Sequence, residues 1–320
     1  MKQEYRVIAI ISVILFVIPW LLPNRYLLSV AVLVGIYSFM TIGLNLLLGY
    51  AGQISMGHAA FYGMGAYTVA VLTTRFHWDP FFALCASLIL VGVIAWLIGK
   101  PTLKLKGHYL AMATLGFGLI VQILLDEMVD ITGGPQGISE IPKLVILGFS
   151  FKDDFQAYFL IWGLVMVVQL MVVNLIKGKM GRAFLAIHSN ELAADSLGIH
   201  TASLKQNIFV MSAVLAALAG AFYAFTINYI SPEPFGFNFS IMLVTMVVIG
   251  GMGNLWGPLL GTALLGILPE MLRSFKNFDI AVYGLLLILI VIFMPKGVIG
   301  LFDWAANSMK KVVKGGRTDE

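Results

Sequence analysis

Apolar residues run along this chain in long blocks that are separated by short polar or glycine-rich stretches. We delimit ten runs, at residues 7–22, 27–49, 58–74, 81–99, 108–128, 157–176, 206–230, 240–256, 258–274 and 281–299. A helix needs about 20 apolar residues to cross the hydrocarbon core of a membrane. Several runs are shorter, so ten spans is a ceiling, and eight spans with broken half-helices is the alternative. The pattern predicts one all-α, polytopic membrane helix bundle over residues 1–320.

The composition supports this class. Hydrophobic residues make up 60% of the chain, charged residues make up 11%, and the mean hydropathy is +0.94. A soluble domain carries about 25% charged residues, so we expect membrane lipid to cover this surface instead. Lys2 and Arg6 precede the first run as in a secretion signal, but no small-residue cleavage site follows, so we expect that run to remain as a span. Cys85 is the single cysteine and has no disulfide partner.

The positions of the basic residues predict the orientation of the chain. If both termini and the connections at 100–107 and 177–205 are cytoplasmic, 14 of the 20 Lys and Arg residues lie inside and 6 lie outside. Such an excess is typical of cytoplasmic loops in inner-membrane proteins. The segment 129–156 is then an extracytoplasmic loop. The basic pI near 9.0 is explained by orientation, and no nucleic-acid partner is expected.

Two glycine-rich breaks, at 49–58 and 250–258, interrupt the apolar runs. Gly and Pro unwind membrane helices, and unwound backbone in transporters often faces the substrate. We therefore place part of the translocation path at these breaks. The candidate residues are Gly49, Gly52, Gln53, Ser55, Gly57 and His58 in the first break, and Gly250, Gly251, Gly253 and Asn254 in the second. The alternative is close helix packing, which small residues also permit.

The segment 177–205 is polar and helix-prone, and it lies between two apolar runs on the predicted cytoplasmic side. It either docks a cytoplasmic partner or is an ordinary loop helix. No Asp or Glu lies in the middle of a predicted span, and no phosphate-binding loop, metal motif or nucleophile elbow is present. Coupled carriers commonly place an ionisable group inside the bundle. We therefore expect no enzyme activity in this chain, and we expect a partner to supply energy.

Four stretches resemble the permeases of branched-chain amino-acid ABC importers. They are Gly43–Tyr67, Thr132–Ile138, Gly181–Ile199 and Gly250–Glu270, in the family's order. The Thr-Gly-Gly-x-x-Gly-Ile element favours the LivM-type member over the LivH-type member. His188 departs from the family pattern, which often has a basic residue there.

The resemblance implies a larger assembly. A second, LivH-type permease, two cytoplasmic ATPases that hold ATP and Mg, and an extracytoplasmic substrate-binding protein would complete the importer, and this chain would hold no cofactor itself. Residues 189–198 would form the ATPase-coupling helix in a groove of one ATPase, with Glu191 bonded to partner donors or capping the helix start. The coupling residues would be Arg182, Asn190, Glu191, Ala193, Ala194 and Gly198.

Three function classes follow. The first is alternating-access import of leucine, isoleucine and valine, or related small amino acids, across the bacterial inner membrane. The second keeps the ABC machinery but carries urea or short amides. The third is a secondary carrier or channel without an ATPase, which the coupling segment and the absence of acids from the middle of the predicted spans oppose. Nothing in the sequence separates the first two, because the binding protein usually sets specificity.

Overall fold

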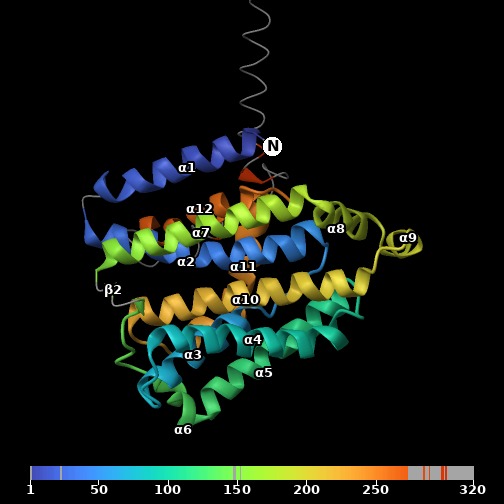
Figure 1. Ribbon diagram of the computed structural model, residues 1–320. Coiled ribbons are helices and arrows are strands. Elements are labelled where there is room, and N and C mark those ends of the chain that lie inside the picture. Colours follow the sequence, from blue (N-terminus) through green and yellow to red (C-terminus); the bar gives the residue numbers. More distant parts are fainter. Residues whose placement is uncertain are drawn as a thin grey trace, which may run out of the picture.

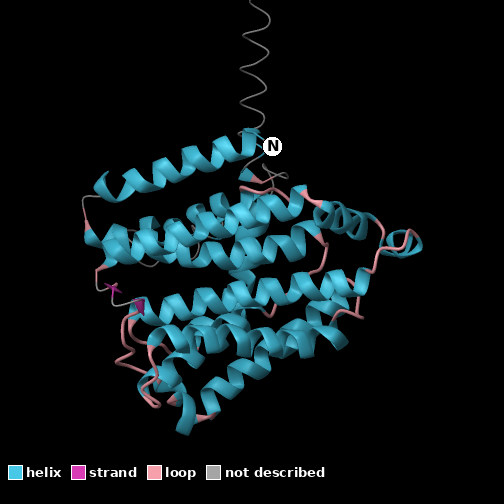
Figure 2. Cartoon of the chain, viewed as in Figure 1, coloured by secondary structure: helices cyan, strands magenta, loops and turns pink. Residues whose placement is uncertain are grey.

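The computed structural model is an all-α membrane bundle, as predicted (Figure 2). The structure describes residues 2–21, 24–146, 149–151 and 153–272, and the single residues Gly284, Ile288, Gly297, Val298 and Gly300. Nine of the ten predicted runs coincide with helices. The tenth run, 281–299, and the C-terminal tail lie almost wholly outside the described residues.

The elements follow one another along the chain with short connections (Figure 1). They are α1 (Lys2–Leu21), α2 (Arg25–Asn45), the π-helical turn η1 (Leu46–Tyr50), α3 (His58–Thr74), α4 (Pro80–Thr102), α5 (His108–Glu127), α6 (Val129–Thr132), the 3₁₀ turn η2 (Gly134–Gln136), β1 (Val145–Ile146), β2 (Phe149–Ser150), α7 (Asp154–Lys177), α8 (Lys179–Ser189), α9 (Glu191–Ser196), α10 (Thr201–Ile227), the 3₁₀ turn η3 (Glu233–Phe235), α11 (Phe237–Gly251) and α12 (Gly257–Leu272).

Five of the described helices are long and apolar enough to cross a membrane: α2 with η1, α4, α5, α7 and α10. Burial separates them into central and outer helices. In their most apolar windows, α2 and α10 are 72% and 67% buried, whereas α4 and α5 are each 28% buried. α2 and α10 therefore form the middle of the bundle, and the outer helices turn apolar side chains outward, as lipid requires. α11 and α12 have 15 and 16 residues, and each is shorter than the roughly 20 needed for a full crossing.

The helices alternate in direction, which gives the bundle two ends. We call the end that carries α8 and α9 the α9 end (Figure 1). The connection 103–107 lies there, because Lys205 at the start of α10 donates a hydrogen bond to the Leu103 carbonyl. Tyr5 of α1 donates to Asn174 near the last turn of α7, so the beginning of α1 lies at this end too.

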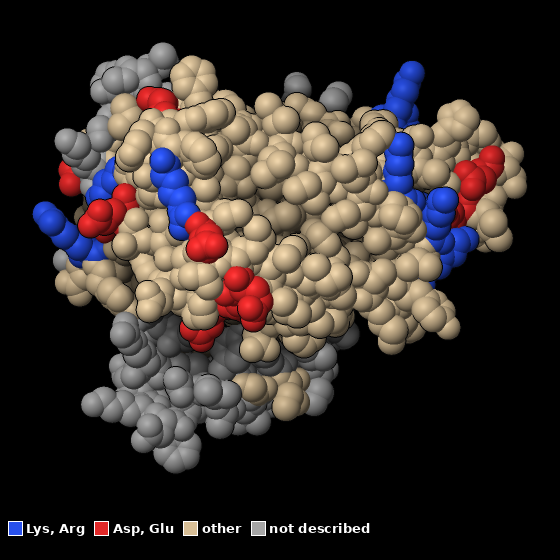
Figure 3. All heavy atoms as spheres, turned by 90° about the horizontal axis from the view of Figure 1, so that it is seen from below, with Lys and Arg blue, Asp and Glu red and all other residues tan. Residues whose placement is uncertain are grey.

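The opposite end, which we call the α6 end, carries the connections after α3 and α5. Arg75 follows α3 and donates to the carbonyl of Asp130 in α6. The segment 129–156 is thus at the end opposite 177–205, as the predicted topology requires, and which end faces the cytoplasm stays a prediction. Charged side chains gather at the two ends of the face in Figure 3, mainly Lys and Arg toward the α9 end, with an uncharged band between.

The connection at the α6 end has a defined fold. β1 and β2 pair as antiparallel strands of two residues each, and Ile138 and Ile230 exchange backbone hydrogen bonds of 2.9 and 3.0 Å. Gly137 has φ +71°, and a Cβ there would lie 1.8 Å from the Ile230 carbonyl oxygen. The glycines of the Thr132–Ile138 motif therefore have a structural role here, because only a glycine lets the backbone approach this closely.

Candidate functional site: two joined helix breaks and the α8–α9 segment

The first break begins where α2 turns into the π-helical η1. Non-helical backbone then runs from residue 51 to 57. Gly52 has φ +66° and is exposed, and a Cβ there would lie 3.2 Å from His188 Nδ1 on α8. The Gln53 side chain is half-buried and donates to the Ala51 carbonyl at 3.1 Å. The start of this break therefore lies at the α9 end, next to the predicted coupling segment.

The rest of the first break enters the bundle. The Met56 amide donates to Thr114 Oγ1 at 3.0 Å, and a Cβ at Gly57 would lie 2.5 Å from the Thr114 carbonyl oxygen on α5. His58 is 1% exposed, with Nδ1 3.1 Å from Ser55 Oγ and Nε2 2.5 Å from Ser212 Oγ on α10. Both ring nitrogens of His58 thus have partners within the chain.

The second break joins α11 to α12 in a tight hairpin. A Cβ at Gly250 would lie 2.0 Å from the Gly257 carbonyl oxygen, so the two helices cross almost backbone to backbone. Gly251 and Gly253 have φ +120° and +69°. The Asn254 side-chain oxygen accepts hydrogen bonds from the Trp256 and Gly257 amides at 2.8 and 3.3 Å. It thereby satisfies donors at the start of α12.

Asn45, at the end of α2, joins the two breaks. Its side-chain nitrogen donates to the Asn254 carbonyl at 2.9 Å, and its side-chain oxygen accepts from the Gly253 amide at 2.9 Å. A Cβ at Gly49 would lie 2.3 Å from the Gly253 nitrogen. Gln169 of α7 adds a third link, because its side chain donates to the Leu255 carbonyl.

The structure thus brings the two predicted break segments together. Gly49, Gly57 and Gly250 are sites of close backbone approach, so the packing role is present at these three glycines. Gly52 and Gly253 are exposed, whereas Ser55, His58 and Gly251 are buried. Whether these residues line the translocation path stays a prediction. Sequence reasoning missed Asn45, Thr114, Gln169 and Ser212, whose signal was a lone polar side chain in an apolar run.

The α8–α9 segment is a pair of short helices at one end of the bundle. Asn190 caps α9, since its side-chain oxygen accepts from the Ala193 amide at 3.1 Å. Gly198 follows α9 with φ +80°, a helix ending that favours glycine. Arg182 on α8 is exposed.

The exposed and buried faces of α9 are clearly different. Ala194 is 2% exposed, whereas Ala193 is exposed. Leu192 and Leu197 are 70% and 80% exposed. The exposed residues here are therefore Leu192, Ala193, Asp195, Ser196 and Leu197, and Ala194 packs inside the chain.

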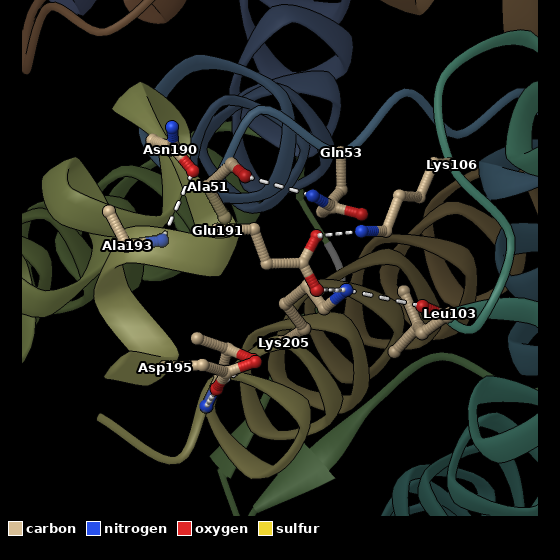
Figure 4. Close-up of polar contacts among 10 residues, drawn as sticks. Ala51, Gln53, Leu103, Lys106, Asn190, Glu191, Ala193, Asp195 and Lys205 are labelled. Carbon is tan, nitrogen blue, oxygen red and sulfur yellow. Dashed lines mark hydrogen bonds and ion pairs between the residues drawn. The ribbon is translucent and has the colours of Figure 1, made fainter. Parts of the chain in front are cut away.

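Glu191 is bonded within the chain (Figure 4). Its Oε1 lies 2.6 Å from Lys205 Nζ, and its Oε2 lies 3.7 Å from Lys106 Nζ. The expectation that this acid caps its own helix is wrong, because Asn190 provides the cap. Two lysines of this chain hold the carboxylate, and a bond from Glu191 to partner donors stays a prediction.

Comparison with known proteins identifies the family. Residues 26–294 match the family described as "Branched-chain amino acid transport system / permease component". The chain is 33% identical to the LivM high-affinity branched-chain amino-acid permease of Escherichia coli K12, over 91% of this chain and 74% of the relative. It is 23% identical to a probable LivM permease of Methanocaldococcus jannaschii, over 87% and 94%.

Two further relatives carry other names. The LivH permease of Salmonella typhimurium is 25% identical, over 82% of this chain and 91% of the relative. The autoinducer 2 import permease LsrC of Escherichia coli K12 is 27% identical, over 77% and 70%. No solved structure matches the chain significantly. The family match covers most of the chain, and the chain belongs to the family of permease components of branched-chain amino-acid transport systems.

Proposed function

We propose that this permease carries leucine, isoleucine, valine or related small amino acids inward across the bacterial inner membrane by alternating access. Two cytoplasmic ATPases, holding ATP and Mg, supply the energy, a LivH-type permease is the second membrane subunit, and an extracytoplasmic binding protein delivers the substrate. The two LivM relatives support the LivM-type assignment, and the LivH relative supports the pairing of two related permeases.

The observation that carries the ATPase-driven mechanism is the apolar face of α9. Leu192 of α9 and Leu197, which directly follows this helix, are exposed, and an N-cap and an ion pair hold the helix in place. A single exposed leucine needs no explanation. Two leucines that are 70% and 80% exposed lie close together at the α9 end of the bundle, and they favour a protein partner that covers them.

The docking role is tested with the double variant Leu192→Ala/Leu197→Ala in the complete reconstituted importer. We expect it to lose ATPase co-purification and substrate-stimulated ATP hydrolysis, because the apolar contact is removed. Met171→Ala is the matched control, since Met171 is 65% exposed on α7, a membrane helix. If the double variant couples as well as the control does, α9 is not the docking element.

The orientation is tested by labelling single cysteines with a membrane-impermeant reagent in a Cys85→Ala background. A cysteine at exposed Ala193 should react only from the cytoplasmic side. A cysteine at exposed Gln136 of η2 should react from outside intact cells. Labelling of position 193 from outside intact cells would show that the predicted topology is reversed.

A second candidate keeps the ABC machinery and changes the cargo. The similarity to an autoinducer 2 import permease favours this candidate. That relative's name gives a different cargo, although its sequence is still detectably similar to this chain. Urea and short amides belong to this second class. Binding assays on the partner binding protein with leucine, valine, urea and an unrelated sugar separate the classes, and tight binding of a solute other than an amino acid would reject the first.

A further inference from the structure

Lys205 is a buried cation beside the membrane. It lies near the start of α10, and its residue is 3% exposed. Its Nζ lies 2.6 Å from Glu191 Oε1 and donates to the Leu103 carbonyl at 3.2 Å (Figure 4). A buried ammonium needs such partners, because removal of one leaves an uncompensated charge in a low-dielectric environment. The position of Glu191 is therefore strongly tied to that of Lys205.

The carboxylate of Glu191 connects three parts of the chain. Glu191 is the first residue of α9, Lys205 belongs to α10, and Leu103 and Lys106 belong to the connection between α4 and α5. The Lys106 contact is longer, at 3.7 Å, and the Lys106 side chain is 63% exposed. Exposed pairs of this kind are weak and screened by salt. At this junction of Glu191 with Lys106 and Lys205, the contact to the buried Lys205 is therefore the stronger one.

A cavity of about 640 Å³ lies directly beside the junction. Glu191, Asp195 and Lys205 line one part of it, and Trp96 and Lys100 of α4 line another. The space between α9 and α4 is thus open rather than filled with side chains. α9 is fixed to the bundle at defined polar contacts, and it does not rest on a continuous apolar interface on this side.

A second polar contact joins α9 to α10. Asp195 Oδ1 accepts from Thr201 Oγ1 at 2.8 Å. The covalent connection between the two helices passes through Gly198 at φ +80°, the Ile199 amide donates to the Ala194 carbonyl at 3.1 Å, and the His200 carbonyl accepts from the Leu204 amide at 3.2 Å. The two side-chain contacts therefore act together with this connection in fixing the distance between α9 and α10.

We infer that the Glu191–Lys205 ion pair transmits displacement of α9 to α10 and to the α4–α5 connection. Glu191 acts inside this chain as a positioning residue and is not the contact to the partner, which is made by the exposed face of α9. The inference rests on the proposed function, because it requires a partner that moves α9. It adds which residues transmit that motion to a central helix of the bundle.

The test uses the complete importer in liposomes with the variants Glu191→Gln and Lys205→Met. Three quantities are measured: ATPase co-purification, the rate of ATP hydrolysis, and solute uptake per ATP hydrolysed. We expect co-purification to stay unchanged while uptake per ATP falls about tenfold, a typical size for the coupling of two sites. The double variant should resemble the single variants, because both changes break one contact.

Two controls separate the possible outcomes. Lys106→Gln removes the weak, exposed contact between Lys106 and Glu191 and should change uptake per ATP by less than about twofold. Glu191→Gln keeps the side-chain shape and decides the case if Lys205→Met fails to assemble. Unchanged uptake per ATP in Glu191→Gln would overturn the inference. So would loss of ATPase co-purification in that variant, since Glu191 would then be a partner contact. Failure of the proposed docking is recognised separately, by unimpaired coupling in Leu192→Ala/Leu197→Ala.

Discussion

The contact between the two breaks is tested by Gly49→Ala. A Cβ at this position would lie 2.3 Å from Asn45 Oδ1 and 2.3 Å from the Gly253 nitrogen. Both contacts are far inside van der Waals distance, and the second one is to backbone. The second break must therefore move away, which removes the 2.9 Å hydrogen bond between the Gly253 amide and Asn45.

The size of the effect follows from three terms. Overpacking costs about 1–3 kcal/mol. Loss of a hydrogen bond from the amide of Gly253, an exposed residue, costs about 0.5–1.5 kcal/mol. Replacement of glycine by alanine in a helical turn returns about 1 kcal/mol. We expect Gly49→Ala to destabilise the permease by about 2 kcal/mol, the sum of the midpoints of these terms.

The measurement is unfolding of the purified permease in mixed micelles with rising denaturing detergent, followed by tryptophan fluorescence. Gly163→Ala is the control, because no neighbouring atom lies within 4 Å of a Cβ built at that helical position on α7. The control should be neutral or stabilised by about 0.5–1 kcal/mol. Equal stability of Gly49→Ala and Gly163→Ala would refute the reasoning that the two breaks are in direct contact.

Three further predictions use the same unfolding measurement. Asn45→Leu should cost about 2 kcal/mol, because it removes both hydrogen bonds from the Asn45 side chain to the backbone of the second break, and an unchanged unfolding midpoint would contradict this link. Thr41→Val should cost about 1 kcal/mol, because it removes the 2.7 Å hydrogen bond with Thr262 that joins α2 to α12. Thr41→Ser keeps the hydroxyl and should retain most of the stability that this bond provides. His58→Phe should cost about 1–3 kcal/mol, because the buried Ser212 hydroxyl loses its partner, and His58→Gln should cost less if hydrogen bonding is the cause.

The helices were predictable because their signal is local. Apolar runs of about 20 residues bounded by charge, glycine or proline mark membrane helices without reference to the rest of the chain. The runs at 58–74 and 108–128 match α3 and α5 within one residue at each end. The positions of the two breaks were predictable for the same reason, since glycines that unwind a helix are visible in the sequence.

The partners of the polar side chains were not predictable. Asn45 and Asn254 are 209 positions apart, and Lys205 and Leu103 are 102 apart, so no spacing rule links them. Glu191 shows the consequence most clearly. An acid at the start of a short helix has three possible uses, which are capping, binding a partner and pairing with a distant cation, and only the fold brings Lys205 close enough to decide.

The attachment of α1 has a consequence for how this chain can be altered. The described contacts of α1 go mainly to α7, through the ring pairs Phe16–Phe159 and Trp20–Phe155, the bond from Tyr158 to the Leu15 carbonyl and the bond from Tyr5 to Asn174. The family match begins at residue 26, after α1. α1 thus lies at the side of the bundle, and fusions or swaps of this helix leave the two breaks and the helices α8 and α9 with all their described contacts.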